Sequence, residues 1–189
     1  MTVEVQRMSY AEFGEAFVRE AVNAQRISAV IYAITGEAVR VGPVEAGPGG
    51  VATAHAVGRI GEPSVLVTTP DPLGYQVSIP AALDVDVTAA GTKHHFDVDA
   101  TVRVAFTVVL APPLSLCVVP DSPTYRDVDV DIRPKGIQAR VLARSGIVER
   151  ELRKHIARYM RERIATEVAA FSEVDLLPLM NAVAKQLTG

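Results

Sequence analysis

The chain has 189 residues, a formal net charge of −3 and a single cysteine, Cys117. This length suits one domain with a sizeable core, and one cysteine excludes an internal disulfide and a multi-cysteine zinc site. The weak acidity argues against general nucleic-acid binding. The sequence opens without a secretory pattern and has no apolar run long enough to span a membrane. We therefore expect one cytoplasmic domain, residues 1–189, that is at most peripheral to a membrane.

Residues 10–36 carry a helical pattern. Ser9 and Glu12 have the spacing of a capping box, and apolar residues then recur at three- and four-residue steps. Gly36 suits the left-handed residue that ends many helices. This pattern predicts an N-terminal helical segment, with a break near Asn23 that divides it into two short helices.

From residue 37 to residue 144 the period of the apolar residues becomes two, which is typical of strands with one buried face. Residues 75–89 alternate over roughly 50 Å at about 3.4 Å per residue, and residues 96–110 return after a turn. Pro80 requires an edge position or a bulge, because it donates no backbone hydrogen bond. Two shorter runs complete the predicted antiparallel sheet: 127–133 and 136–143.

Residues 145–189 are predicted to form a long C-terminal helix and a short tail helix. The long helix begins near Ser145 and runs to about Phe171, over roughly 39 Å at about 1.5 Å per residue. Apolar residues recur along it at four-residue steps. We expect an α+β fold, in which a long, strongly curved antiparallel sheet wraps around this helix.

The stretch KHHFDVD, residues 93–99, raises the question of a metal or acid–base site. On a strand His95, Asp97 and Asp99 share one face at steps of about 7 Å, too wide for joint coordination with ligand bonds of about 2 Å. His94 points to the other face. Cross-strand ion pairs on a solvated sheet face account for these residues. We predict no metal, no cofactor and no catalytic residue here or elsewhere in the chain.

The long C-terminal helix is rich in arginine. Residues 144–163 contain seven Arg and Lys residues but only three Glu residues. Such a helix can lie on anionic lipid headgroups, or its charges can pair with the acidic face of the sheet. The candidate headgroup or membrane-surface contacts are Arg153, Arg158 and Arg161.

An apolar sheet face and an apolar helix flank are both long in this chain. Many of their side chains are Val or Ala, so packing them together leaves room for an apolar ligand. The candidate groove residues are Val77, Ile79, Leu83, Val85, Val87, Phe96, Val98, Val102, Val104, Phe106, Leu152, Ile156 and Met160.

The order of these segments resembles the tubular lipid-binding superfamily, which includes bactericidal permeability-increasing and synaptotagmin-like lipid-transfer domains and small bacterial relatives. The resemblance covers residues 10–171. It implies an apolar groove that accepts acyl chains, and it brings no catalytic residues. The segments that carry it are AVIYAITG, GPVEAGPGG, the hairpin YQVSIPAALDVDV–GTKHHFDVDATVRVAF, and VDVDIRPKGIQARVLARSGIVERELRKHIARYMRERI.

We expect a non-enzymatic homodimer that binds or transfers lipids or similar apolar molecules. Two alternatives stay open. In the first, a ligand-free dimeric scaffold fills the same concavity with its own helices or its partner. In the second, a cyclase or isomerase of the helix-grip type acts on an apolar substrate. The enzyme needs a polar side chain in the cavity, and the candidates are His94, Tyr75 and His55.

Overall fold

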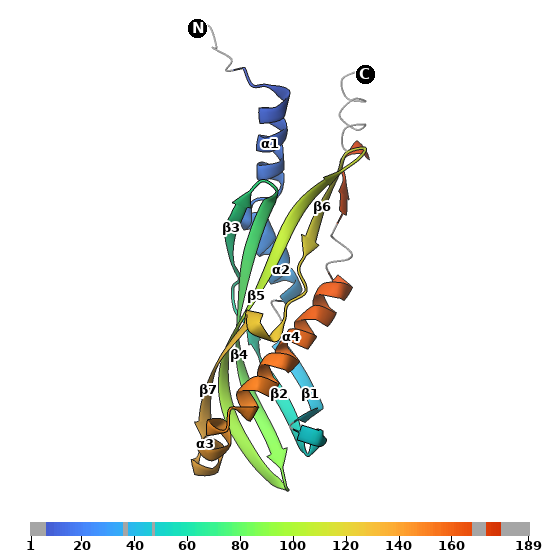
Figure 1. Cartoon of the computed structure of the whole chain (residues 1–189). Helices are drawn as coiled ribbons and strands as arrows, with labels where there is room; N and C mark the ends of the chain where they lie inside the picture. The colour runs from blue at the N-terminus through green and yellow to red at the C-terminus, as the bar shows by residue number, and fades with distance from the viewer. Residues whose placement is uncertain (1–6, 36–37, 47, 168–172, 179–189) are drawn as a thin grey trace.

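The structure is a computed structural model that describes residues 7–35, 38–46, 48–167 and 173–178 (Figure 1). The described residues form an α+β fold, in which helices accompany a strongly curved antiparallel half-barrel sheet. The strands of the sheet are β1 (Ala38–Ala46), β2 (Ala52–Ile60), β3 (Ser64–Pro70), β4 (Leu73–Ala89), β5 (Thr92–Ala111), β6 (Ser115–Pro120), β7 (Val128–Lys135) and β8 (Glu173–Asp175).

The β4–β5 hairpin is the spine of the sheet, as the long alternating runs predict. The two strands pair continuously from Gly74 opposite Thr107 to Ala89 opposite Thr92. The turn between them holds Ala90 and Gly91, both with positive φ, which suits a tight hairpin. At the lower end of Figure 1 the strand order is β1-β2-β4-β5-β7, and at the upper end it is β3-β4-β5-β6-β8.

Pro80 lies where β4 changes its neighbour. Pairing with β2 ends at Ala81 and pairing with β3 begins at Ser78. On the edge of β4 that pairs with β2 and β3, the Pro80 carbonyl accepts the Gly61 backbone N–H at 2.8 Å. The missing N–H of proline therefore costs no ladder bond, and the predicted edge-like position is confirmed.

The N-terminal segment divides into α1 (Tyr10–Ala21) and α2 (Ala24–Thr35), so the predicted break near Asn23 is confirmed. The capping box is present: Ser9 Oγ accepts the Glu12 backbone N–H at 3.2 Å, and Glu12 Oε2 accepts the Ser9 N–H at 2.7 Å. The predicted stop at Gly36 lies outside the described residues. Helix α2 contacts β3 and covers the upper half of the sheet.

The predicted strand at 136–143 is wrong, because this segment is helix α3 (Ile137–Arg144). Gly136 leaves the strand with φ of 105°, a conformation that ends the extended chain. The following residues are mostly good helix formers, with Ala, Gln, Arg and Leu. On the helix Ala139 is buried at 2% exposure, whereas Ile137 and Val141 face outward.

Helix α4 (Ile147–Glu167) is the C-terminal helix of the described chain, and its predicted extension to Phe171 lies outside the described residues. Its Ala157 and Met160 are buried against the apolar sheet face. Most of the predicted tail helix is also outside the described residues, but Glu173–Asp175 form β8 instead and pair with β6. None of the helices in the described ranges is both long and apolar enough to cross a membrane.

Candidate functional site

A cavity of about 90 Å³ lies between α4 and the inner face of the lower sheet. Its sheet wall comes from β1, β2, β4 and β5, and its helix wall is the stripe of α4 that repeats at three- and four-residue steps. The helix contributes Leu152, His155, Ile156, Tyr159 and Met160. The strands contribute Val39, Val41, Val44, Ala54, Ala56, Ile60, Ile79, Ala81, Leu83, Val85, Ala100 and Val102.

A second cavity of about 160 Å³ continues toward the lower end of the sheet. It shares Ala54, Val85, Leu152 and His155 with the first cavity, so the two form one interrupted groove. We call this pair of cavities the apolar groove. Its lower part is further lined by Ala46, Val51, Ala52, Val87, Ala89, Leu142, Ile147, Val148 and Glu151.

Small side chains create the space in the apolar groove. Ala54, Ala56, Ala81 and Ala100 line the first cavity from three adjacent strands. A packed interior leaves few voids larger than a water molecule, whereas an engineered apolar cavity of about 150 Å³ stays dry and binds benzene. The groove therefore has the chemistry to hold a slender apolar group.

His155 brings a polar group to the junction of the two cavities. The Arg158 guanidinium donates to His155 Nδ1 across 2.6 Å, so this nitrogen carries no proton. A hydrogen bond with the Glu45 backbone ties the ring to β1. Burial, and then the Arg158 charge, lowers the pKa of His155 below its ordinary value. The ring is therefore neutral at physiological pH.

The three polar side chains proposed for an enzyme do not meet in the groove. Tyr75 is 2% exposed, and its hydroxyl donates to the Val22 carbonyl between α1 and α2. Burial raises the pKa of Tyr75, which keeps the phenol protonated as a donor. His55 is exposed on β2, and His94 is half-buried near the hairpin turn. The three side chains therefore do not lie together at one site where they could act on a substrate.

The predicted groove residues divide into two sets. Those that line the groove are Ile79, Leu83, Val85, Val87, Val102, Leu152, Ile156 and Met160. Those buried in the packed core, at 6% exposure or less, are Val77, Phe96, Val98, Val104 and Phe106. Ligand contact by either set stays a prediction.

Sequence reasoning missed the β1–β2 wall and the place of His155. The β1 residues Val39, Val41 and Val44 line the groove across a register shift, which interrupts their alternation. His155 belongs to the stripe of α4 by spacing, three residues after Leu152, but its polarity hid this. Helical spacing alone was the signal that could have found it.

The three predicted headgroup contacts differ in their surroundings. Arg153 is half-buried and pairs with Glu149 at 2.8 Å, one helical turn earlier. Arg158 is exposed and holds the His155 ring, and Arg161 is exposed. The alternative prediction, pairing with the acidic sheet face, does not describe Arg153, whose partner lies on α4 itself.

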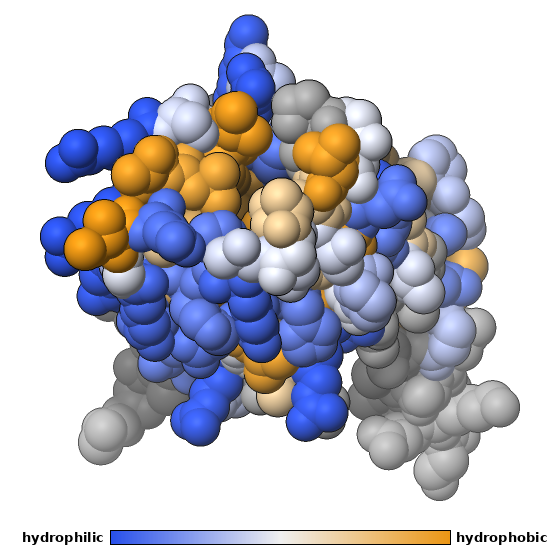
Figure 2. All heavy atoms as spheres, turned by 90° about the horizontal axis from the view of Figure 1, so that it is seen from below, coloured by the Kyte–Doolittle hydropathy of each residue, from blue (hydrophilic) through white to orange (hydrophobic). Residues whose placement is uncertain are grey.

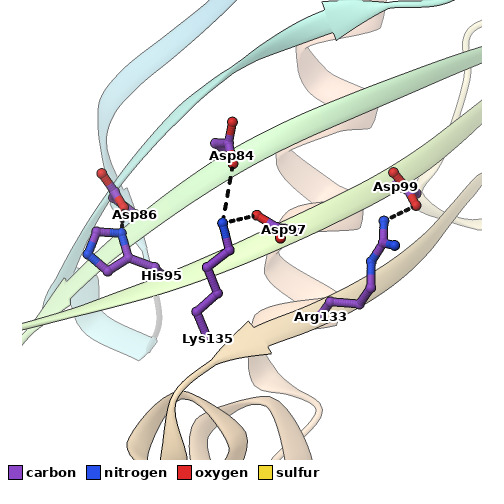
Figure 3. A network of polar contacts seen from close by, with 7 residues as sticks. All are labelled: Asp84, Asp86, His95, Asp97, Asp99, Arg133 and Lys135. Atoms are coloured by element: carbon purple, nitrogen blue, oxygen red, sulfur yellow. Dashed lines mark hydrogen bonds and ion pairs between the residues drawn. The ribbon is translucent and has the colours of Figure 1, made fainter.

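The outer face of the sheet answers the question of KHHFDVD. His94 lies on the opposite face to its neighbour, and the outward residues form ion pairs across strands, as predicted. Lys135 Nζ lies 2.6 Å from Asp97 and 3.9 Å from Asp84, and hydrogen bonding to Lys135 lowers the pKa of Asp97. In the described residues no cluster of three His, Cys, Asp or Glu side chains could hold a metal ion. Figure 3 shows the network: Lys135 with Asp97 and Asp84, Arg133 with Asp99, and His95 with Asp86.

No known protein-family pattern matches the chain, and no curated protein matches it.

Proposed function

We propose that the protein binds lipids or similar apolar molecules in the apolar groove, without catalysis. The observation that carries the proposal is the predominantly aliphatic lining of both walls of the groove. The resemblance to the tubular lipid-binding superfamily supports it, and so does the half-barrel sheet. In this proposal the sheet wraps around α4 when an acyl chain fills the space between them.

The groove favours a slender ligand. Its cavities of about 90 and 160 Å³ lie below the roughly 300–1,000 Å³ of drug-sized pockets. An extended acyl chain is narrow, and movement of α4 away from the sheet would lengthen its path. In this arrangement the exposed Arg158 guanidinium, which lies beside His155, would meet a polar or anionic headgroup outside the cavities.

Native mass spectrometry of the purified protein tests the proposal directly. We expect a bound apolar molecule, which solvent extraction then releases for identification. A protein that carries nothing and does not take up the fluorescent fatty acid cis-parinaric acid would contradict lipid binding.

Blocking the groove gives a second test. Ala54→Leu places three further carbon atoms where the two cavities meet, so we expect weaker cis-parinaric acid uptake with stability unchanged or raised by about 1 kcal/mol. Ala82→Leu is the matched control, because Ala82 is exposed on the outer face of β4. Equal uptake by both variants would place the ligand elsewhere.

A ligand-free dimeric scaffold is the second candidate, and exposed apolar side chains on one edge strand of the sheet favour it. Exposed apolar side chains on β3 include Leu66 at 66% and Val67 at 52%. A dimer in solution with no bound molecule would support this candidate instead.

A further inference from the structure

The outer face of α3 combines apolar and cationic side chains. Ile137 is 81% exposed and Val141 is 67% exposed, and they lie one helical turn apart. At about 100° per residue, Arg144 lies about 20° from Ile137 around the helix, and Arg140 lies about 60° from Ile137 on the side away from Val141, so the two arginines flank the apolar pair. The opposite face holds Ala139, which is buried against the sheet. Helix α3 therefore has its own buried side and leaves two aliphatic side chains in water.

The two arginines on this face are available to a partner. Arg140 and Arg144 are both exposed, and neither forms an ion pair within the part of the chain that the structure describes. The nearby Lys135, in contrast, is occupied by Asp97. The face thus presents two positive charges beside its apolar pair.

Helix α3 stands at one end of an elongated molecule (Figure 1). Figure 2 looks at this end and shows hydrophobic side chains exposed among hydrophilic ones. Leu142, on the inner side of α3, lines the lower cavity. A surface that meets α3 therefore also lies next to the lower end of the apolar groove.

We propose that α3 docks the protein on anionic lipid bilayers. Ile137 and Val141 enter the boundary between headgroups and acyl chains, while Arg140 and Arg144 contact the anionic headgroups. The inference goes beyond ligand binding in the groove, because a bilayer can meet α3 whether or not the groove is filled. It also places membrane contact on α3 rather than on the arginines of α4.

A second copy of the chain suits this face less well. A symmetric contact centred on α3 would bring the arginine pairs of the two copies close together, where like charges repel. A stable interface also needs about 800 Å² from each partner, far more than one face of a two-turn helix offers. An anionic bilayer attracts both arginines and accepts the two aliphatic side chains.

Co-sedimentation with vesicles tests the proposal. We expect the protein to bind vesicles of phosphatidylcholine mixed with phosphatidylglycerol, and to bind pure phosphatidylcholine weakly. An arginine near an anionic surface is worth roughly a fivefold gain, so Arg140→Gln with Arg144→Gln should weaken binding roughly thirtyfold. Ile137→Ser with Val141→Ser should weaken it about tenfold or more.

Matched controls come from other exposed residues. Arg40→Gln with Arg59→Gln removes two exposed cations from the β1–β2 hairpin, and Leu66→Ser removes an exposed leucine from β3. These controls should bind vesicles like the parent. All variants should unfold at the same urea concentration as the parent, because every changed side chain lies on the surface.

Three results would overturn the proposal. The first is that the parent does not bind anionic vesicles. The second is that the control variants lose as much vesicle binding as the α3 variants. The third is that no variant binds vesicles and the α3 variants have a lower mass in solution than the parent. The last result would make α3 a contact between copies. Uptake of cis-parinaric acid without vesicles is measured on the same variants, and we expect it unchanged. If the parent protein took up no cis-parinaric acid, ligand binding in the apolar groove would be contradicted, but bilayer docking through α3 would not.

Discussion

Leu152→Ala should separate a ligand groove from an ordinary core. Leu152 lines both cavities, so its side chain already lacks neighbours on two sides. Leu→Ala in a packed core costs about 2.7–5.0 kcal/mol, and much of the variation comes from the new cavity. Because the space beside Leu152 already exists, we expect a loss near 2 kcal/mol, together with a wider groove that takes up more cis-parinaric acid.

Leu116→Ala is the matched control for this prediction. Leu116 is 3% exposed on β6 and belongs to the core cluster of the upper half. Its removal opens a new cavity, so we expect a loss of about 3–4 kcal/mol with no change in fatty-acid uptake. Urea unfolding measures the losses, and probe fluorescence measures uptake. Equal stability losses and unchanged uptake in both variants would refute the view that Leu152 walls a ligand groove.

Two further predictions concern the elements around the groove. Because the pKa of His155 is lower in the folded state than in the unfolded chain, the unfolded chain is protonated first, and stability should fall as the pH drops below about 6.5. His155→Gln should flatten this part of the pH profile of the melting temperature. An unchanged profile would contradict a neutral His155 ring in the folded protein. Gly58→Ala should cost about 3 kcal/mol in urea unfolding, because its Cβ would stand 2.2 Å from the Ala82 carbonyl oxygen and 2.8 Å from Leu83 Cα. Gly14→Ala in α1, where a Cβ meets nothing within 4 Å, should instead stabilise the protein by about 1 kcal/mol, and similar losses at both glycines would contradict the steric argument.

The spine of the fold could be read from the sequence because long patterns average out local exceptions. Alternation over β4 and β5 could be satisfied only by two strands with one buried face. Pro80 added a positional constraint, and the structure meets it at the change of neighbour from β2 to β3. In each case one chemical requirement had one geometric solution.

Helix α3 could not be read in the same way. Over eight residues, alternating aliphatic and polar side chains fit a strand, and the helix is visible only once the exposure of Ile137 and Val141 is known. A strand reading would have buried both residues. Their exposure breaks the rule that the apolar face turns inward, and such local exceptions are expected where a surface has another task.

The groove was harder to predict than the strands that form it. Alternation assigns a residue to a face, but it does not say which element covers that face. Tyr75 and Val77 share the inner face of β4 with Ile79, yet they pack into the upper core beside Val22, while Ile79 reaches the cavity below α4. The order of helices over the sheet is a tertiary property, so a pattern on one strand could not divide core from groove.

The two halves of the sheet are covered differently, and this suggests where a ligand would enter. The upper half is closed by a specific contact, the hydrogen bond from the Tyr75 hydroxyl to the Val22 carbonyl. The lower half is covered by α3 and α4, which leave two cavities, and α4 is tied to β1 through His155. Opening there breaks fewer buried contacts, since the cavity walls already lack neighbours. The lower end also carries the exposed face of α3, so bilayer docking and groove opening would occur at the same end of the molecule.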